Sequence, residues 1–105
     1  MSEIWIVRST FAKKDEAVFA ARELLEARLI ACANVTAPVT SLYRWEDMVQ
    51  EEQEVVLWVK TTAGKAKKVC ARLGSLNHYQ LPAIIAWPIP LVDDDFAKWV
   101  ADEVA

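Results

Sequence analysis

Two long strands are predicted by ACANVTAPVTSLYRWEDMVQEEQEVVLWVKTT, residues Ala31 to Thr62, the stretch of sequence that decides the fold. The chain is expected to fold back on itself at Glu46-Asp47. At about 3.3 Å per strand residue, the arm from Val49 to Thr61 runs for roughly 40 Å, whereas a compact 100-residue domain has a radius of gyration of about 13 Å. We therefore expect the excess length to bend, twist away or be shared with another chain.

The two arms of this hairpin differ in pattern. Pro38 interrupts the first arm, and because proline cannot donate to a ladder it predicts a bulge or an edge position. The apolar residues of this arm are Cys32, Val35, Val39, Leu42 and Tyr43. The second arm ends in Val55-Val56-Leu57-Trp58-Val59, which is apolar on both faces and predicts a central strand.

Strands and helices alternate in the rest of the chain. Strands are predicted at Ile4–Val7 and Ala83–Trp87, and a connection at Asn77–Pro82 leads from the second helix into the latter strand. Three helices are predicted from apolar residues at helical spacing, the second with Thr62 as its N-cap and the third after Asp93. Their stripes are Ala17, Ala21, Leu24, Leu25 and Arg28; Ala66, Val69, Cys70, Leu73 and Leu76; and Phe96, Trp99 and Val100.

This order predicts an α+β fold with one ferredoxin-like βαββαβ domain over residues 1–105, a long hairpin and an extra C-terminal helix. In such a sheet the first and third strands lie inside, and here these are the two strands that are apolar on both faces. Two helices cover one face. Since Trp58 and its neighbours cannot all point at the helices, we expect a partner chain to cover the other face.

Composition limits the classes of function. The chain has 105 residues, is 54% hydrophobic and carries a net charge of −3, without the basic footprint of a nucleic-acid-binding protein. We expect a cytoplasmic protein, because we recognise no signal peptide and no run of about 20 apolar residues that would span a membrane. Cys32 and Cys70 form no C-x-x-C unit and are expected to be thiols.

Five segments together resemble, in order and spacing, the CutA divalent-cation-tolerance family. They are Leu29-Ile30-Ala31-Cys32-Ala33-Asn34, Ser41-Leu42-Tyr43-Arg44-Trp45-Glu46, Glu54 through Thr61, Tyr79-x-x-Pro82 and Phe96-x-x-Trp99. The resemblance covers essentially the whole chain. It implies a tight homotrimer in which the hairpins exchange edge pairing, and a link to tolerance of copper and other divalent metals. The architecture also resembles that of the trimeric PII signalling proteins, which is an analogy of fold.

The sequence departs from the family pattern in two places. The family usually has His-Pro-Tyr-Glu before x-Pro-Glu, whereas this chain has Asn77-His78-Tyr79-Gln80-Leu81-Pro82-Ala83. The histidine is thus displaced by one position, and two carboxylates are replaced by Gln80 and Ala83. The hairpin tip, typically Glu-Gly-Lys in the family, is Glu46-Asp47-Met48 here.

Cys32 and His78 are the candidate metal ligands. Cys32 aligns with a cysteine characteristic of the family, and a thiolate suits Cu(I) or another soft ion. The alternative is that Cys32 is a small buried hydrophobe, as is expected of Cys70. His78 is the only histidine, so a site that uses it needs ligands from elsewhere, and an exposed loop residue is the alternative.

Five residues are predicted to line a pocket between subunits, where aromatic rings would stack and one residue of each charge would orient a small anion or amine. They are Tyr43, Trp45, Glu54, Lys60 and Tyr79. The alternative is an ordinary interface in which the Glu–Lys pair sets the register.

Catalysis has little support in the sequence. We find no nucleophile–base pair and no phosphate-binding loop, and we expect a protein that is not an enzyme. Two function classes remain, a trimeric metal-tolerance protein and a PII-like interaction module that binds a small ligand between subunits.

Overall fold

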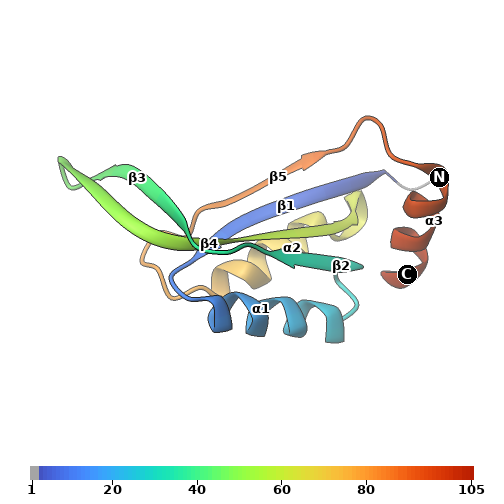
Figure 1. The fold of residues 1–105 in the computed structure, drawn as a ribbon. Helices are drawn as coiled ribbons and strands as arrows, with labels where there is room; N and C mark the ends of the chain where they lie inside the picture. The colour runs from blue at the N-terminus through green and yellow to red at the C-terminus, as the bar shows by residue number, and fades with distance from the viewer. Residues whose placement is uncertain (1–2) are drawn as a thin grey trace.

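The computed structural model describes residues 3–105, and its elements follow the predicted order (Figure 1). They are β1 (Ile4–Phe11), α1 (Lys14–Glu26), β2 (Cys32–Val35), β3 (Val39–Trp45), β4 (Met48–Thr62), α2 (Ala63–Leu76), β5 (Ile84–Pro88) and α3 (Asp94–Glu103). The predicted βαββαβ order with an extra helix is confirmed. The first arm of the hairpin is divided into β2 and β3.

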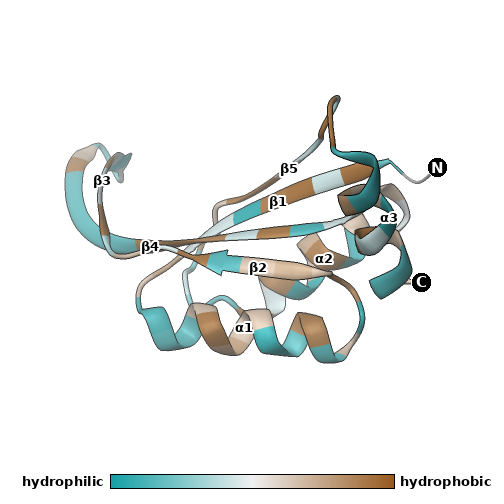
Figure 2. Cartoon of the chain, turned by 45° about the vertical axis from the view of Figure 1, so that its right-hand side comes forward, coloured by the Kyte–Doolittle hydropathy of each residue, from teal (hydrophilic) through white to brown (hydrophobic). Residues whose placement is uncertain are grey.

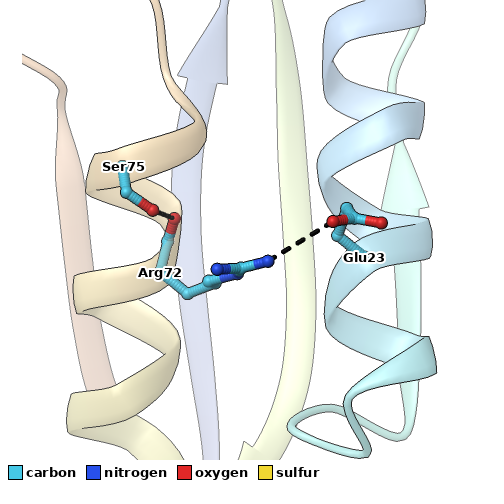
Figure 3. A network of polar contacts seen from close by, with 3 residues as sticks. All are labelled: Glu23, Arg72 and Ser75. Atoms are coloured by element: carbon cyan, nitrogen blue, oxygen red, sulfur yellow. Dashed lines mark hydrogen bonds and ion pairs between the residues drawn. The ribbon is translucent and has the colours of Figure 1, made fainter.

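The strands form an antiparallel sheet with the order β2-β4-β1-β5, and β3 pairs with the outer half of β4. As predicted, the two strands inside the sheet are those whose sequences are apolar on both faces. Helices α1 and α2 cover one face, α1 over β4 and β2 and α2 over β1 and β5. Figure 3 shows the two helices in front of the strands, bridged by Arg72 and Glu23, whose charged atoms are 3.3 Å apart.

The core lies between the sheet and these two helices. It is built from alternate residues of β1 and β4, such as Val7, Leu57 and Val59, packed against Leu24 of α1 and Leu73 of α2, all fully buried. Because side chains alternate between the two faces of a strand, the intervening residues point to the opposite face.

Helices α1 and α2 leave the opposite face of the sheet bare, and α3 covers only one end of it (Figure 1). The bare face carries Ile6, Trp58 and Trp87, all partly buried, and the exposed Ile85. The two indole rings meet edge to face with their centroids 6.1 Å apart. This face is the one for which the sequence predicts a partner chain, and the partner itself stays a prediction.

The hairpin of β3 and β4 projects beyond the helices and gives the chain its longest dimension, 45 Å against 26 and 23 Å (Figure 1). It turns at the predicted residues, Glu46 and Asp47, whose φ angles are 50° and 65°. Two left-handed residues in a row are typical of the tight turn that joins twisted antiparallel strands. Figure 2 shows that the outer part of β4 is largely hydrophilic and the inner part largely hydrophobic.

The interruption predicted at Pro38 is a bulge in the first arm. Val35 pairs with Leu57 and Val39 with Glu54, so three residues, 36–38, lie opposite two residues of β4. Thr36 bridges the gap, because its amide donates to the carbonyl of Val56 at 3.0 Å and its hydroxyl accepts from the amide of Val56 at 2.9 Å. The extra residue shifts the register of β3 relative to β2 by one.

The stripe predicted for the first helix is partly wrong. Ala17, Ala21 and Leu24 are buried, but Leu25 is exposed, and Arg28 lies beyond the end of α1 with a φ of 55°. The helix ends at Glu26. Its buried face includes Ala20, so Leu25 lies at the edge of that face and is exposed.

The stripe predicted for the third helix is also partly wrong. Val100 is buried, but the buried residues beside it are Ala97 and Val104, while Phe96 and Trp99 are 38% and 43% exposed. Those two rings instead pack on each other, with their centroids 5.7 Å apart.

The predicted ends of other elements are shifted. Thr62 occupies the N-cap position of α2 as predicted, but its side chain makes no capping hydrogen bond. Strand β1 runs on to Phe11, and β5 begins and ends one residue later than predicted. Strand β1 is longer because Ser9 and Thr10, which look polar in sequence, are buried beside β4.

Candidate functional site

A cavity of about 550 Å³ lies at the base of the hairpin, and four of the five residues predicted to share a pocket line it. These four are Tyr43, Trp45, Glu54 and Tyr79. The rest of the lining is Arg8, Thr10, Ser41, Leu42, Arg44, Gln80, Leu81 and Ala83. The cavity is therefore built by β1, β3, β4 and the connection after α2.

The bulge decides which side chains of β3 lie on the same side of the hairpin as Glu54. Tyr43 pairs with Gln50 and Val39 with Glu54, so Tyr43 lies on the same side of the hairpin as Glu54. In the register of β2, Tyr43 would instead pair with an odd-numbered residue of β4 and point to the other side. The extra residue before Val39 thus brings Tyr43 and Trp45 to the bare face of the sheet.

Tyr79 and Glu54 form the polar centre of the cavity. Burial raises the pKa of the Tyr79 hydroxyl, and so do its hydrogen bond to the Glu54 carboxylate and the negative charge of that carboxylate. At neutral pH the phenol is therefore the donor and Glu54 the acceptor.

Asn77 fixes the backbone of this connection. Its side-chain amide is buried and donates to the carbonyl of Thr10 at 2.9 Å, while its side-chain oxygen accepts from the amide of Tyr79 at 2.8 Å. Thr10 and Tyr79 both line the cavity. Asn77 therefore holds one wall of the cavity against another.

Lys60 is not among the lining residues of this cavity. Its side chain lies further along the bare face, where its ammonium donates to the Oδ1 atom of Asn34 on the neighbouring strand β2. Within one chain the predicted Glu54–Lys60 pair is therefore not formed.

Cys32 lies at the start of β2, opposite Lys60. Its side chain is partly buried on the bare face; burial raises the pKa of the thiol, and the Lys60 ammonium partly offsets that rise. Cys70 is packed against the core from α2, as predicted for a structural residue, and burial raises the pKa of its thiol too.

His78 lies at the other end of the sheet from Cys32, near the start of α1. Its Nδ1 atom is 3.3 Å from a carboxylate oxygen of Glu16, and its side chain is 74% exposed. It borders a second, smaller cavity of about 340 Å³ between α1 and the end of α2. Within residues 3–105, no three His, Cys, Asp or Glu side chains come together as a metal site, so Cys32 and His78 do not share one within the chain.

The sequence reasoning missed two residues of the site, Arg8 and Asn77. Arg8 directly follows the predicted strand Ile4–Val7, and it was missed because the observed strand β1 continues through it to Phe11. Asn77 directly follows α2, and an asparagine just after a helix is a common turn residue, so its buried hydrogen bonds had no distinct signal.

Comparison with known proteins identifies the family. Residues 5–103 match the family described as CutA1 divalent ion tolerance protein. The divalent-cation tolerance protein CutA of Thermus thermophilus is 36% identical over 97 residues, which cover 92% of this chain and 94% of that protein.

Solved structures show the same fold. The crystal structure of the divalent ion tolerance protein CutA1 from Ehrlichia chaffeensis superposes with a TM-score of 0.95 at 32% identity, covering 100% of this chain and 98% of that one. CutA from Archaeoglobus fulgidus, described as a periplasmic divalent cation tolerance protein, has a TM-score of 0.93 at 29% identity, covering 97% and 99% of the two chains.

Among the described residues, no helix is long and apolar enough to cross a membrane. The cytoplasmic location stays a prediction, because the Archaeoglobus relative is described as periplasmic.

The raised pKa of Tyr79 makes stability depend on pH. Below the unfolded-state pKa of 10.0 the contribution of the neutral phenol is complete, and it is lost as the pH rises toward the folded-state value. The free energy of unfolding, measured by urea denaturation between pH 8 and pH 11, should fall more steeply for the wild type than for Tyr79→Phe. Equal slopes for the wild type and Tyr79→Phe would contradict the placement of Tyr79.

Asn77→Ala should destabilise the chain by about 1–3 kcal/mol, because the carbonyl of Thr10 and the amide of Tyr79 both lose a buried partner. Guanidinium denaturation followed by circular dichroism measures the loss. Asn34→Ala removes an exposed side-chain amide that accepts from Lys60 and should cost about 1 kcal/mol or less. A smaller effect at Asn77 than at Asn34 would argue against its role as an anchor.

Proposed function

Since the chain belongs to the CutA1 family of divalent ion tolerance proteins, we propose that it acts in tolerance of divalent cations as a homotrimer without catalytic activity. The observation that carries this proposal is the match to the family over residues 5–103. The absence of catalysis is supported by the cavity lining, which among the described residues holds no histidine or cysteine and one carboxylate, already hydrogen-bonded to Tyr79.

The trimer is supported by the bare sheet face and the projecting hairpin. Partly buried Trp58 and Trp87 and exposed Ile85 form an apolar surface that the chain's own α1 and α2 do not reach. On the hairpin, Leu42 and Val49 are each 66% exposed. Apolar surfaces of this kind are typical of contacts between protein chains.

Sedimentation equilibrium should give three times the 11.8 kDa mass of the chain for the wild type. Ile85→Arg should dissociate the assembly, because the added cation would be buried on the bare face opposite the like charge of Arg8. Phe19→Arg is the control, since Phe19 is exposed on α1, on the other side of the sheet. A stable, folded wild-type monomer would refute the trimer.

Cys32 is the residue that we propose binds the metal. One thiolate is too few for a closed site, so the remaining ligands would come from other copies of the chain across the bare face. Copper(I) must displace the thiol proton, and the raised pKa of Cys32 therefore makes binding tighter as the pH rises.

Competition against a chromogenic Cu(I) chelator tests this assignment. Cys32→Ser should lower the affinity by at least about tenfold, which corresponds to about 1.4 kcal/mol. Cys70→Ser should bind like the wild type, because Cys70 packs against the core. Equal affinities for the wild type and Cys32→Ser would remove Cys32 from the site.

A second function, binding of a small ligand between subunits, is favoured by one observation. The cavity at the base of the hairpin collects Tyr43, Trp45 and Tyr79 from separate parts of the chain around Glu54. Its volume of about 550 Å³ is within the usual range for small-molecule sites, about 300–1,000 Å³. This reading makes the protein a binding module and is compatible with a metal site at Cys32.

A further inference from the structure

Two charged side chains of the bare face line the cavity at the base of the hairpin, Arg8 and Glu54. Arg44 borders the cavity from β3, but it lies between Tyr43 and Trp45, so its side chain points to the other side of that strand. The Glu54 carboxylate accepts a hydrogen bond from Tyr79. Neither arginine makes an ion pair with any carboxylate in the part of the chain that the structure describes. The cavity therefore presents positive charge that the chain itself does not neutralise.

Arg8 is held in place by the sheet. It is flanked by Trp58 of β4 and Ile85 of β5, and its guanidinium carbon lies 5.4 Å from the centre of the Trp58 ring. A guanidinium group over an aromatic face keeps the N–H donors at its edge available for a carboxylate in the same plane. Arg8 is also partly buried, where a charge-assisted hydrogen bond is stronger than in open water.

Three aromatic side chains line the same cavity as Arg8. Tyr43 and Trp45 come from β3, and Tyr79 comes from the connection that Asn77 anchors. Aromatic rings placed around a cavity favour a flat ligand that stacks on one of them.

We propose that this cavity binds a planar aromatic carboxylate, with its carboxylate on the guanidinium of Arg8 and its ring against Tyr43 and Trp45. The proposal rests on the ligand-binding function above and names the class of ligand. An amine of the same shape is disfavoured, because Arg8 repels it and the carboxylate of Glu54 already accepts from Tyr79.

Three probes of matched shape test the charge of the ligand: 2-naphthoate, 2-naphthamide and 2-naphthylmethylammonium. Calorimetric titration of the full-length protein in its native assembly should show that naphthoate binds at least about tenfold more tightly than the amide, as expected for hydrogen bonds to a charged group. The indole N–H signal of Trp45, followed by NMR, should move with naphthoate.

The matched variants are Arg8→Gln and Arg22→Gln. Arg8→Gln should weaken naphthoate binding by at least about tenfold, while Arg22→Gln, at an exposed position on α1, should leave it unchanged. If Arg8→Gln does not assemble in sedimentation, Arg8→Lys takes its place; it keeps the charge but loses the bidentate fork, and it should weaken naphthoate binding several-fold.

Two results would overturn the proposal, and they differ in what they leave standing. If the ammonium or the amide binds as tightly as naphthoate, or if the Arg8 variants bind naphthoate like the wild type, the anionic class is wrong and the cavity remains a ligand site. If no probe binds and the Trp45 signal does not move, both the ligand class and the ligand-binding function fail.

Discussion

The structure depends on the continuous pairing of β4. This strand of 15 residues carries hydrogen-bonded ladders to β1, β2 and β3 at once. Because side chains alternate along a strand, its register assigns every paired residue to the helix-covered face or to the bare face. The core under α1 and α2, the cation at Arg8 and the thiol at Cys32 all take their positions from this one ladder.

The bulge at residues 36–38 is the one place where that assignment changes. Along the inner half of β4, the first arm keeps Ala33 and Val35 against the core. After the extra residue, Tyr43 and Trp45 share a side with Glu54. A proline that cannot donate to the ladder thus separates a structural half of the arm from a half that lines a cavity.

Much of the fold could be predicted because its signals are local. The apolar runs at Ile4–Val7 and Val55–Val59 marked the inner strands, and Pro38 marked the bulge. Which residues of each helix are buried could not be predicted in the same way. Leu25 and Trp99 fit their stripes by spacing, yet both are exposed, because the rotation of a helix on the sheet depends on small residues such as Ala20 and Ala97 that allow close approach.

The candidate site could be predicted only in part. Tyr43, Trp45, Glu54 and Tyr79 were grouped with the help of a family resemblance, and the structure brings these four together. Lys60 lies on the same sheet face but further along it, beside Asn34. A sequence pattern indicates on which face a strand residue lies, but not how far it lies from the cavity. Arg8 was missed because its neighbours in the cavity come from β3 and β4, distant in sequence.

The departures from the family pattern at Gln80 and Ala83 both remove negative charge from the cavity. Gln80 and Ala83 line the cavity at positions where the resemblance implies carboxylates, and the wall formed by β1 carries the cation of Arg8. Asn77 meanwhile keeps the connection in place through its bonds to Thr10 and Tyr79, so the replacements do not need to alter the backbone. With the shape kept and negative charge removed, the same cavity becomes poorer for hard cations, which prefer carboxylate oxygen ligands, and better for an anion. This is why we propose the thiol of Cys32, and not the cavity, as the metal ligand.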